Sequence, residues 1–423
     1  MRYQPWVSDQ DWESKDPKLR EYHAQPAVLR HTSALCEKIA LHPEGILIVR
    51  GPRQVGKSTF LREFASKCLN ESIRAENIVL FDVERFSTYH ELRAVIELFL
   101  EETAGYRIVL LDELTSADEW WRALKVLSDT GALADVLVIG TGSSADDLRQ
   151  GADRLPGRRG RRYPVDFELL PVRFADVHSH LTVKEFLLTG GMPWAVNEYL
   201  RLGEIPSHVY ALYAGWIQSA AQRRGHLVHS LPSLLNGIVR HLSTPVSVQK
   251  LSRDCGIGSN RTAESYLALL QDNYALIPSY WTDTTTGAIS PRKNRKFYPF
   301  DPLLYHLFAE FGKGWDFAYT TSLMRTADQS KKGPLIECVV AAEIRHRITT
   351  DHLGYWQGRK EIDFLKPGCI EVKYQNTVSI AEFEWASKVL PPNTVLQVIT
   401  KQTNARADRI ELIDLERWLL KNN

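Results

Sequence analysis

The stretch that decides the fold of the first part of the chain is Gly45–Thr59, with the sequence GILIVRGPRQVGKST. Its first six residues are an apolar run, typical of a strand that is buried on both faces of a sheet. The next eight residues match the pattern GxxxxGK[ST], and a helical pattern begins at Lys57. Glycines let the backbone wrap around an anion, and the N–H groups at the start of a helix bind it. The stretch therefore predicts a phosphate-binding loop between a strand and a helix.

A loop of this kind predicts ATP as the cofactor, bound together with Mg²⁺. We expect Lys57 to supply a positive charge to the phosphates and the Ser58 hydroxyl to bind the magnesium ion. The full set of residues expected to contact the nucleotide in this loop is Gly51, Gln54, Val55, Gly56, Lys57, Ser58 and Thr59.

A second apolar run, Arg107–Asp112, ends in two adjacent carboxylates, Asp112 and Glu113. Asp112 is expected to bind magnesium through water, and Glu113 is expected to orient and deprotonate the water that attacks the phosphate. Further apolar runs at Asn77–Asp82, Asp135–Gly140 and Arg162–Phe167 alternate with helical patterns at about 57–69, 87–103, 118–130 and 145–150. This alternation predicts an α/β domain with a parallel sheet covered by helices.

An arginine-rich segment, Arg149–Arg162, holds six arginines and one acidic residue. One hypothesis is that Arg158, Arg159, Arg161 or Arg162 reaches the γ-phosphate on a neighbouring subunit, where it would stabilise transition-state charge. The alternative is a solvated run of charge.

The middle of the chain carries helical patterns from about 180 to 273, including a helix from Val248, a turn at Gly256–Gly258 and a second helix that starts after Ser259 and runs to about Asp272. Two strand candidates follow, so that this part reads as a winged helix-turn-helix. Nucleic acid, in the first place DNA, is the partner it predicts, although such modules also bind proteins. The residues expected to contact it are Arg261 on the second helix and the basic residues Arg292, Lys293, Arg295 and Lys296 near the second strand.

From about Gly333 the element order is αβββαβ: a helix over 335–347, strands at Leu353–Gln357, Lys360–Leu365 and Cys369–Tyr374, a helix over 380–389, a strand at Val395–Thr400 and a last helix over 407–420. Alternation places Glu371 and Lys373 on one face of their strand, where Asp363 from the adjacent strand can meet them. Asp363 and Glu371, helped by the Val372 carbonyl and by Glu337 on the helix, are expected to bind Mg²⁺ or Mn²⁺. Lys373 is expected to orient or activate water.

The loop GPRQVGKSTFL, the run LLDEL, the segments GTGSSADDL and LPGRRGRRYPV, and TGGMPWAV together resemble one family. They are similar to bacterial and archaeal AAA+-type ATPases that carry a winged helix and a C-terminal restriction-endonuclease-like domain. The resemblance implies ATP hydrolysis and a homo-oligomer. It also implies that Thr141 or Ser143 contacts the γ-phosphate, the alternative being that these are helix-capping residues, and that the last domain is a PD-(D/E)XK nuclease, which relatives of this fold can also carry in an inactive form.

The length of 423 residues predicts two to four domains, and we place them at 1–175, 176–330 and 331–423. Lys plus Arg number 52 and Asp plus Glu number 51, so the net charge is +1 and any contact with nucleic acid must rely on local patches. The five cysteines are scattered, the N-terminus lacks an apolar signal core, and no apolar run approaches the ~18 residues that span a bilayer. We therefore expect a cytoplasmic protein with no membrane segment, which either cleaves nucleic acid or acts as a nucleotide-switched regulatory module.

Overall fold

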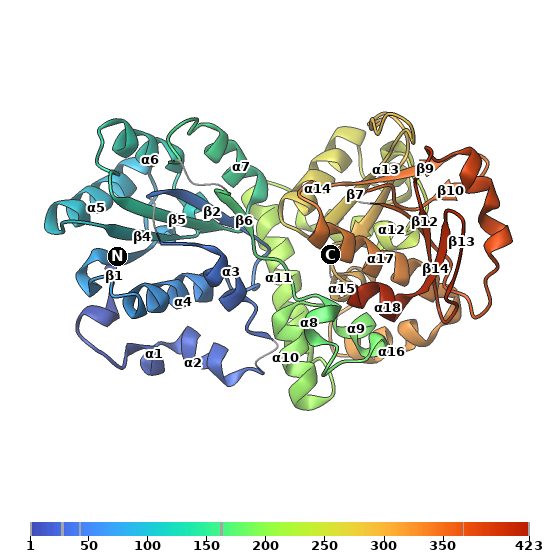
Figure 1. The fold of residues 1–423 in the computed structure, drawn as a ribbon, viewed down its shortest axis with the longest axis horizontal. Helices are drawn as coiled ribbons and strands as arrows, with labels where there is room; N and C mark the ends of the chain where they lie inside the picture. Colours follow the sequence, from blue (N-terminus) through green and yellow to red (C-terminus); the bar gives the residue numbers. More distant parts are fainter. Residues whose placement is uncertain (1, 27–28, 42–43, 161–163, 367, 422–423) are drawn as a thin grey trace. The chain divides into compact units, whose positions relative to one another are not determined.

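The computed structural model describes residues 2–26, 29–41, 44–160, 164–366 and 368–421. The chain forms two compact units, unit 1 at Met1–Leu170 and unit 2 at Pro171–Asn423; the elements of each are shown in Figure 1. The sequence predicts a second boundary near residue 331, and in the structure the residues on both sides of that position belong to unit 2. The reason is a shared sheet, because strand β7 (Leu276–Trp281) pairs with strand β9 (Leu353–Gln357).

Unit 1 is built on a six-stranded sheet with the order β1-β3-β4-β5-β2-β6. Strands β2 to β6 run parallel, and β1 pairs antiparallel with β3 at one edge. Continuous apolar runs form the central strands and are buried almost throughout, as a sheet covered on both faces requires. The strands are β1 (Arg2–Tyr3), β2 (Gly45–Arg50), β3 (Ile78–Asp82), β4 (Arg107–Asp112), β5 (Val136–Gly142) and β6 (Asp166–Glu168).

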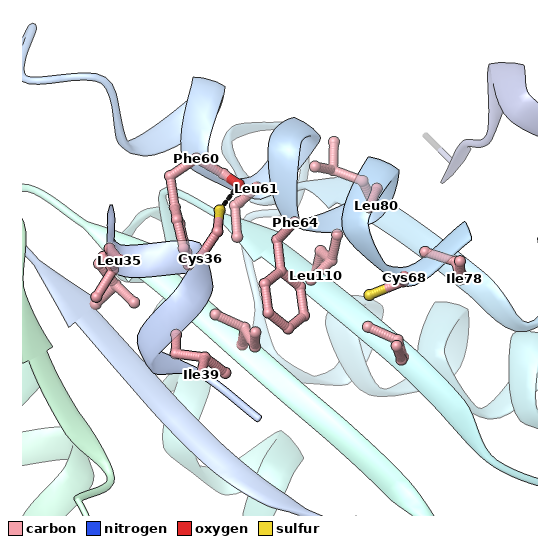
Figure 2. Close-up of a cluster of buried hydrophobic side chains, with 14 of the residues drawn as sticks. Leu35, Cys36, Ile39, Phe60, Leu61, Phe64, Cys68, Ile78, Leu80 and Leu110 are labelled. Atoms are coloured by element: carbon pink, nitrogen blue, oxygen red, sulfur yellow. Dashed lines mark hydrogen bonds between the residues drawn. The ribbon is translucent and has the colours of Figure 1, made fainter. Parts of the chain in front are cut away.

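Helices cover both faces of this sheet, as the alternating pattern predicts. On one face Phe60, Leu61 and Phe64 of α4 pack with Leu35 and Cys36 of α3 (Figure 2). On the other face the apolar sides of α5, α6 and α7 form a second core. The helices are α1 (Trp12–Lys15), α2 (Pro17–Ala24), α3 (Thr32–Lys38), α4 (Lys57–Asn70), α5 (Tyr89–Glu102), α6 (Trp120–Asp129) and α7 (Ala145–Asp153).

Unit 2 begins with helices and continues into mixed sheets. The helix from Val248 and the helix that follows the Ser259 cap are both confirmed, and β7 and β8 form the antiparallel hairpin expected after them. The helices of this unit are α8 (Phe174–Val177), α9 (Val183–Thr189), α10 (Pro193–Leu202), α11 (Ser207–Arg223), α12 (Leu231–Arg240), α13 (Val248–Asp254), α14 (Asn260–Asp272), α15 (Pro302–Glu310), α16 (Ala318–Ala327), α17 (Gln329–Arg347) and α18 (Leu415–Leu420). No helix in the described ranges is both long enough and apolar enough to span a bilayer.

Two four-stranded sheets complete unit 2, with the orders β10-β9-β7-β8 and β11-β12-β14-β13. A bridge between Phe364 and Ile370 connects them, so the strands that carry Asp363 and Glu371 are neighbours. The strands are β8 (Arg295–Pro299), β10 (Glu361–Ile362), β11 (Cys369–Val372), β12 (Leu396–Thr400), β13 (Ala405–Ala407) and β14 (Ile410–Asp414), with β7 and β9 as above.

The expectation of one last helix over 407–420 is wrong in its first half. Residues Ile410–Asp414 form β14, which pairs with β12 in parallel and with β13 in an antiparallel hairpin. The physical reason is that Ile410, Leu412 and Ile413 find an open edge of β12 to bury against, and only Leu415–Leu420 remains helical. The segment at 380–389 winds as a 3-10 helix, Ile380–Lys388.

Candidate functional site

The phosphate-binding loop of unit 1 lies between β2 and α4, as predicted. A side chain at position 51 would place its Cβ 2.1 Å from the Leu169 carbonyl oxygen, so only glycine fits there. Gln54 and Gly56 have φ angles of 63° and 104°, which turn the backbone into the first turn of α4. Val55 is buried, while Ser58 and Thr59 are half-buried at the start of the helix. The loop therefore presents its N–H groups and the helix start to the same place.

Lys57 folds back over this loop. Its Nζ donates to the carbonyl oxygens of Gly51 and Pro52, at 3.0 and 2.8 Å. Burial lowers the pKa of Lys57, and nearby Arg53 lowers it further, while Glu113 and Asp112 oppose the shift. The side chain is 5% exposed and its ammonium has neutral partners only. Such an ammonium gains strongly from an anion, because no carboxylate is bonded to it.

The two carboxylates after β4 are each held by a hydroxyl from β5. The Thr141 hydroxyl donates to Asp112 Oδ1 at 2.9 Å, and the Ser143 hydroxyl donates to Glu113 Oε2 at 3.3 Å. This pairing follows from the sheet order, because β5 lies between β2 and β4 and brings their carboxyl ends together. Thr141 is fully buried and contacts Asp112, so it serves to orient that carboxylate. The hydroxyl of Ser58 and the carboxylate of Asp112 are hard oxygen donors that fit Mg²⁺.

A second cluster of charged side chains lies in unit 2. Lys296, on β8, places its Nζ 2.7 Å from Asp363 Oδ1 and 3.5 Å from Glu337 Oε2, and it also pairs with Glu361. Its side chain is 0% exposed. The Val372 N–H donates to Asp363 Oδ2 at 2.9 Å. We call Glu337, Glu361, Asp363 and Glu371 with Lys296 the carboxylate cluster.

The carboxylate cluster sets four carboxyl groups around one ammonium. Burial, with Asp363 nearby, raises the pKa of Glu337 to about 8, and the same two causes raise that of Glu371 well above its usual range. The pKa of Lys296 is raised well above its usual value, because the attraction of Asp363, Glu337 and Glu361 outweighs burial. Tyr298, on the same strand, donates to Glu337 at 3.0 Å. Glu371 Oε2 is buried with no hydrogen-bond partner among the described residues.

The predicted metal ligands of unit 2 thus lie near each other, but they surround an ammonium. Among the residues that the structure describes, no three His, Cys, Asp or Glu side chains are arranged as a metal site. The oxygen donors and the partnerless Glu371 oxygen fit a divalent cation in chemistry. Lys373 is half-buried after β11, and its backbone N–H donates to Ile399.

Comparison with known proteins bears on unit 1 most directly. Residues 43–178 match the model of a family described as an AAA domain. Unit 1 is an AAA-type P-loop ATPase domain. Residues 181–313 match a second family, described only as a domain of unknown function.

Whole-chain relatives are distant. An uncharacterized protein of Haemophilus influenzae is 24% identical over 418 residues, covering 89% of this chain and 94% of that protein. A Walker-type ATPase of Pyrococcus abyssi is 16% identical with a TM-score of 0.41, covering 67% of this chain and 95% of that one. The Aeropyrum pernix Orc1 protein, solved in complex with DNA, is 14% identical with a TM-score of 0.32, covering 74% and 97%. Scores this low carry no inference about the function of this chain.

The arginines proposed as a finger of the ATPase domain are engaged within unit 1. Arg158 pairs with Asp129, and Arg159 bonds Asp166 together with the carbonyl oxygens of Ile46 and Val165. Arg159 is 14% exposed and ties β2 to the segment before β6, so its guanidinium is a structural group. Arg161 and Arg162 lie outside the described residues.

The basic residues near β8 differ from the expectation of a solvent-facing patch. Lys296 is buried in the carboxylate cluster and cannot contact a phosphate from outside, so that assignment is wrong. Arg295 bonds both oxygens of Glu264 on α14, at 2.8 and 2.9 Å. Arg261, Arg292 and Lys293 are exposed, and Lys293 lies over the Trp281 ring. Three of the five predicted basic contacts therefore remain available to a partner.

Sequence reasoning missed that Lys296 belongs to the carboxylate cluster. A signal is present in the sequence, because Lys296 is the second residue of β8, in which Phe297 and Tyr298 are buried. A lysine near the start of such a strand can extend inward, and alternation puts it on the same face as Tyr298. Glu361, in the predicted strand Lys360–Leu365, has no role in the sequence-based prediction.

Proposed function

We propose that this protein is an ATP-driven enzyme that binds nucleic acid, DNA in the first place, and cleaves its phosphodiester backbone at the carboxylate cluster of unit 2. The observation that carries the proposal is the convergence of the buried Asp363 with the half-buried Glu337, Glu361 and Glu371, where one buried Glu371 oxygen has no hydrogen-bond partner among the described residues. Buried carboxylates without partners are costly unless they serve a ligand. A cluster of this kind is suited to hydrolysis rather than to packing.

In unit 1 the proposed roles follow the geometry of the loop. Lys57 binds the β- and γ-phosphates, and Ser58 and Asp112 hold Mg²⁺. Glu113 orients and deprotonates the attacking water, and Ser143, whose hydroxyl bonds to Glu113, is assigned the contact with the γ-phosphate, because the Thr141 hydroxyl is bonded to Asp112. Gly51, Gln54, Val55, Gly56 and Thr59 complete the nucleotide contacts.

In unit 2 the proposed nucleic-acid contacts are the exposed start of α14 and the hairpin beside it. Asn260 and Arg261 lie on the first, exposed turn of α14, while Ala263, Tyr266 and Leu267 face the core. This is the arrangement of a recognition helix. Arg292 and Lys293 in the neighbouring hairpin would contact phosphates, which makes binding sensitive to salt. In this reading the protein acts as a homo-oligomer in the cytoplasm.

The proposed cleavage uses Asp363 and Glu371, with the Val372 carbonyl and Glu337, as ligands of a Mg²⁺ or Mn²⁺ ion. Such an ion would polarise the scissile phosphate and neutralise the charge that develops on it. Lys373, which alternation places on the same face as Glu371, would orient the attacking water and lower its pKa.

A second candidate function is a nucleotide-switched module that binds nucleic acid or protein through unit 2 and does not cut. The observation that favours it is Lys296, whose ammonium holds Asp363 and Glu361 in ion pairs. Under that function ATP changes affinity for the partner, and the carboxylate cluster only stabilises the fold.

The test is incubation of the purified full chain with plasmid, linear DNA and RNA, with and without ATP, in Mg²⁺ and in Mn²⁺. We expect metal-dependent cleavage that Asp363→Asn abolishes while ATP hydrolysis continues. The exposed Glu384→Gln variant is the matched control and should cut normally. Intact ATP hydrolysis without cleavage of any substrate would contradict the proposed nuclease activity and favour the nucleotide-switched module.

A further inference from the structure

Lys296 occupies the place in the carboxylate cluster that a bound cation would take. Its Nζ lies 2.7 Å from Asp363 Oδ1, 3.5 Å from Glu337 Oε2 and in direct contact with Glu361. These partners come from different elements, α17 and the β10 region, and Lys296 itself comes from β8. A side chain that bridges three elements through three carboxylates does the work of a structural cation.

Both oxygens of Asp363 are already engaged in this arrangement. Lys296 bonds Oδ1, and the Val372 N–H donates to Oδ2. A divalent ion that ligates Asp363 would lie within a few ångströms of the ammonium, and repulsion at that separation in a buried site is strong. The ion and the ammonium therefore exclude one another at Asp363.

The cluster nevertheless keeps one carboxyl oxygen unsatisfied. Three carboxylates pair with the ammonium of Lys296, and Oε2 of a fourth, Glu371, is buried with no hydrogen-bond partner among the described residues. A well-satisfied structural ion-pair network would leave no such oxygen. The partnerless oxygen thus points to a second occupant, and the donor set selects a hard cation.

We propose that Lys296 is a tethered competitor of the metal ion: its ammonium holds the carboxylate cluster closed, and a divalent cation binds only as it displaces that ammonium. This inference rests on the proposed hydrolytic function of the cluster. The strand that carries Lys296 also carries Arg295, which pairs with Glu264 of α14. The lysine is therefore attached to the element proposed to read nucleic acid, and metal entry is tied to the position of β8.

The experiment is calorimetric titration of Mn²⁺ into the full chain without nucleotide, for the wild type, Lys296→Met and Lys296→Gln. Removal of one positive charge from the cluster should tighten Mn²⁺ binding at least about tenfold. Lys360→Met, which removes an exposed lysine next to Glu361, is the matched control and should bind as the wild type does. Adding Asp363→Asn to Lys296→Met should abolish the gain, which places the ion in the cluster.

Equal or weaker Mn²⁺ binding by both Lys296 variants would overturn the inference. Melting temperatures with and without Mn²⁺ guard against misfolding, since the ion should restore whatever stability the ammonium supplied. Variants that stay unfolded at saturating Mn²⁺ would also contradict it, because ion and ammonium would then not be interchangeable. If the Lys296 variants bind Mn²⁺ more tightly but no variant cleaves nucleic acid, the inference about Lys296 stands and the proposed nuclease function falls. If the wild type cleaves nucleic acid but the Lys296 variants do not bind Mn²⁺ more tightly, the nuclease function stands and the inference falls.

Discussion

The two units each bury a lysine near carboxylates, and the two lysines are held in opposite ways. Lys57 in unit 1 bonds two backbone carbonyl oxygens, and burial lowers its pKa. Lys296 in unit 2 bonds carboxylates directly, and their attraction outweighs burial and raises its pKa. The same side chain at similar depth is therefore bonded to neutral carbonyl oxygens in one unit and to carboxylates in the other.

This difference indicates what each site lacks. Among the described residues the ammonium of Lys57 is hydrogen-bonded to carbonyl oxygens, with Asp112 and Glu113 nearby, so it gains most when an anion such as a nucleotide phosphate arrives. Around Lys296, three carboxylates share one ammonium and a buried oxygen of Glu371 has no hydrogen-bond partner among the described residues, so this cluster gains most from a cation. The partners of a buried lysine thus distinguish an anion site from a cation site where the lysine alone does not.

The strongest test of the difference between Lys57 and Lys296 is to remove the charge of each lysine in turn. Lys296→Met should lower the free energy of unfolding of unit 2 by about 3–5 kcal/mol without metal, because it leaves buried carboxylates unpaired. Hydrogen exchange of unit 2 peptides during urea unfolding measures this loss separately from unit 1. If the free energy of unfolding falls by less than about 1 kcal/mol, protons are able to neutralise the carboxylates without Lys296. That result would contradict the difference drawn between Lys296 and Lys57.

The corresponding change in unit 1 should act on function rather than stability. Lys57→Met is expected to reduce ATP turnover by at least about 100-fold, since a buried cation that meets phosphate charge is lost. The stability of unit 1 should stay equal or rise, because the variant buries a methyl group in place of an ammonium with neutral partners only. Steady-state ATP hydrolysis and hydrogen exchange of unit 1 peptides are the two measurements, with exposed Lys38→Met as control. A destabilised unit 1 would show that Lys57 is structural, as Lys296 is.

The hydroxyl of Thr141, on β5, allows a finer test of the nucleotide site. Thr141→Val keeps the shape of a fully buried side chain and removes the hydrogen bond to Asp112. ATP turnover should fall by about 10–100-fold, mainly through magnesium-dependent steps, because Asp112 loses its fixed orientation. Titration of Mg²⁺ against turnover should show a higher requirement for the ion. A variant with an unchanged Mg²⁺ requirement would contradict the positioning role of Thr141.

Much of unit 1 can be predicted from its sequence, because its signals are local. Strands such as β2 and β4 are continuous apolar runs, and the loop between β2 and α4 has a fixed spacing that glycine geometry enforces. Thr141 and Ser143 are expected from the resemblance to AAA+-type ATPases, and the order β4-β5-β2 in the structure places their hydroxyls beside Asp112 and Glu113. The ion pairs of Arg158 with Asp129 and of Arg159 with Asp166 could not be predicted, because these partners lie outside any local pattern.

Unit 2 is harder to predict because its determinants are long-range. Lys296 reads as part of a basic run, and its carboxylate partners Glu337, Glu361 and Asp363 come much later in the chain. Periodicity depends on residues that are close in sequence, whereas the burial of a lysine depends on residues that are close in space. The same reason explains β14, where a short apolar stretch is compatible with a helix until β12 offers it an edge.

His306 of unit 2 is a third buried side chain that can take up a proton, beside Lys57 and Lys296. Among the described residues no carboxylate is bonded to it. Its ring bonds the Leu187 carbonyl oxygen at 2.9 Å and lies near Arg325, and burial lowers its pKa to about 3. Below pH 6.5 the unfolded chain therefore takes up a proton that the folded chain refuses. Stability that is fully present above that pH is lost as pH falls, by about 1 kcal/mol between pH 6.5 and 5.5.

His306→Gln should remove that pH-dependent loss, because its amide can donate to Leu187 and does not titrate. Urea unfolding of unit 2 at pH 7.5, 6.5 and 5.5 gives the slope for both proteins, and exposed His208→Gln serves as control. An unchanged slope in His306→Gln would mean that the folded state accommodates a charged ring. Burial away from carboxylates would then not be enough to keep a basic side chain neutral. The proposal that Lys57 binds an anion would have to rest on its contact with phosphate alone.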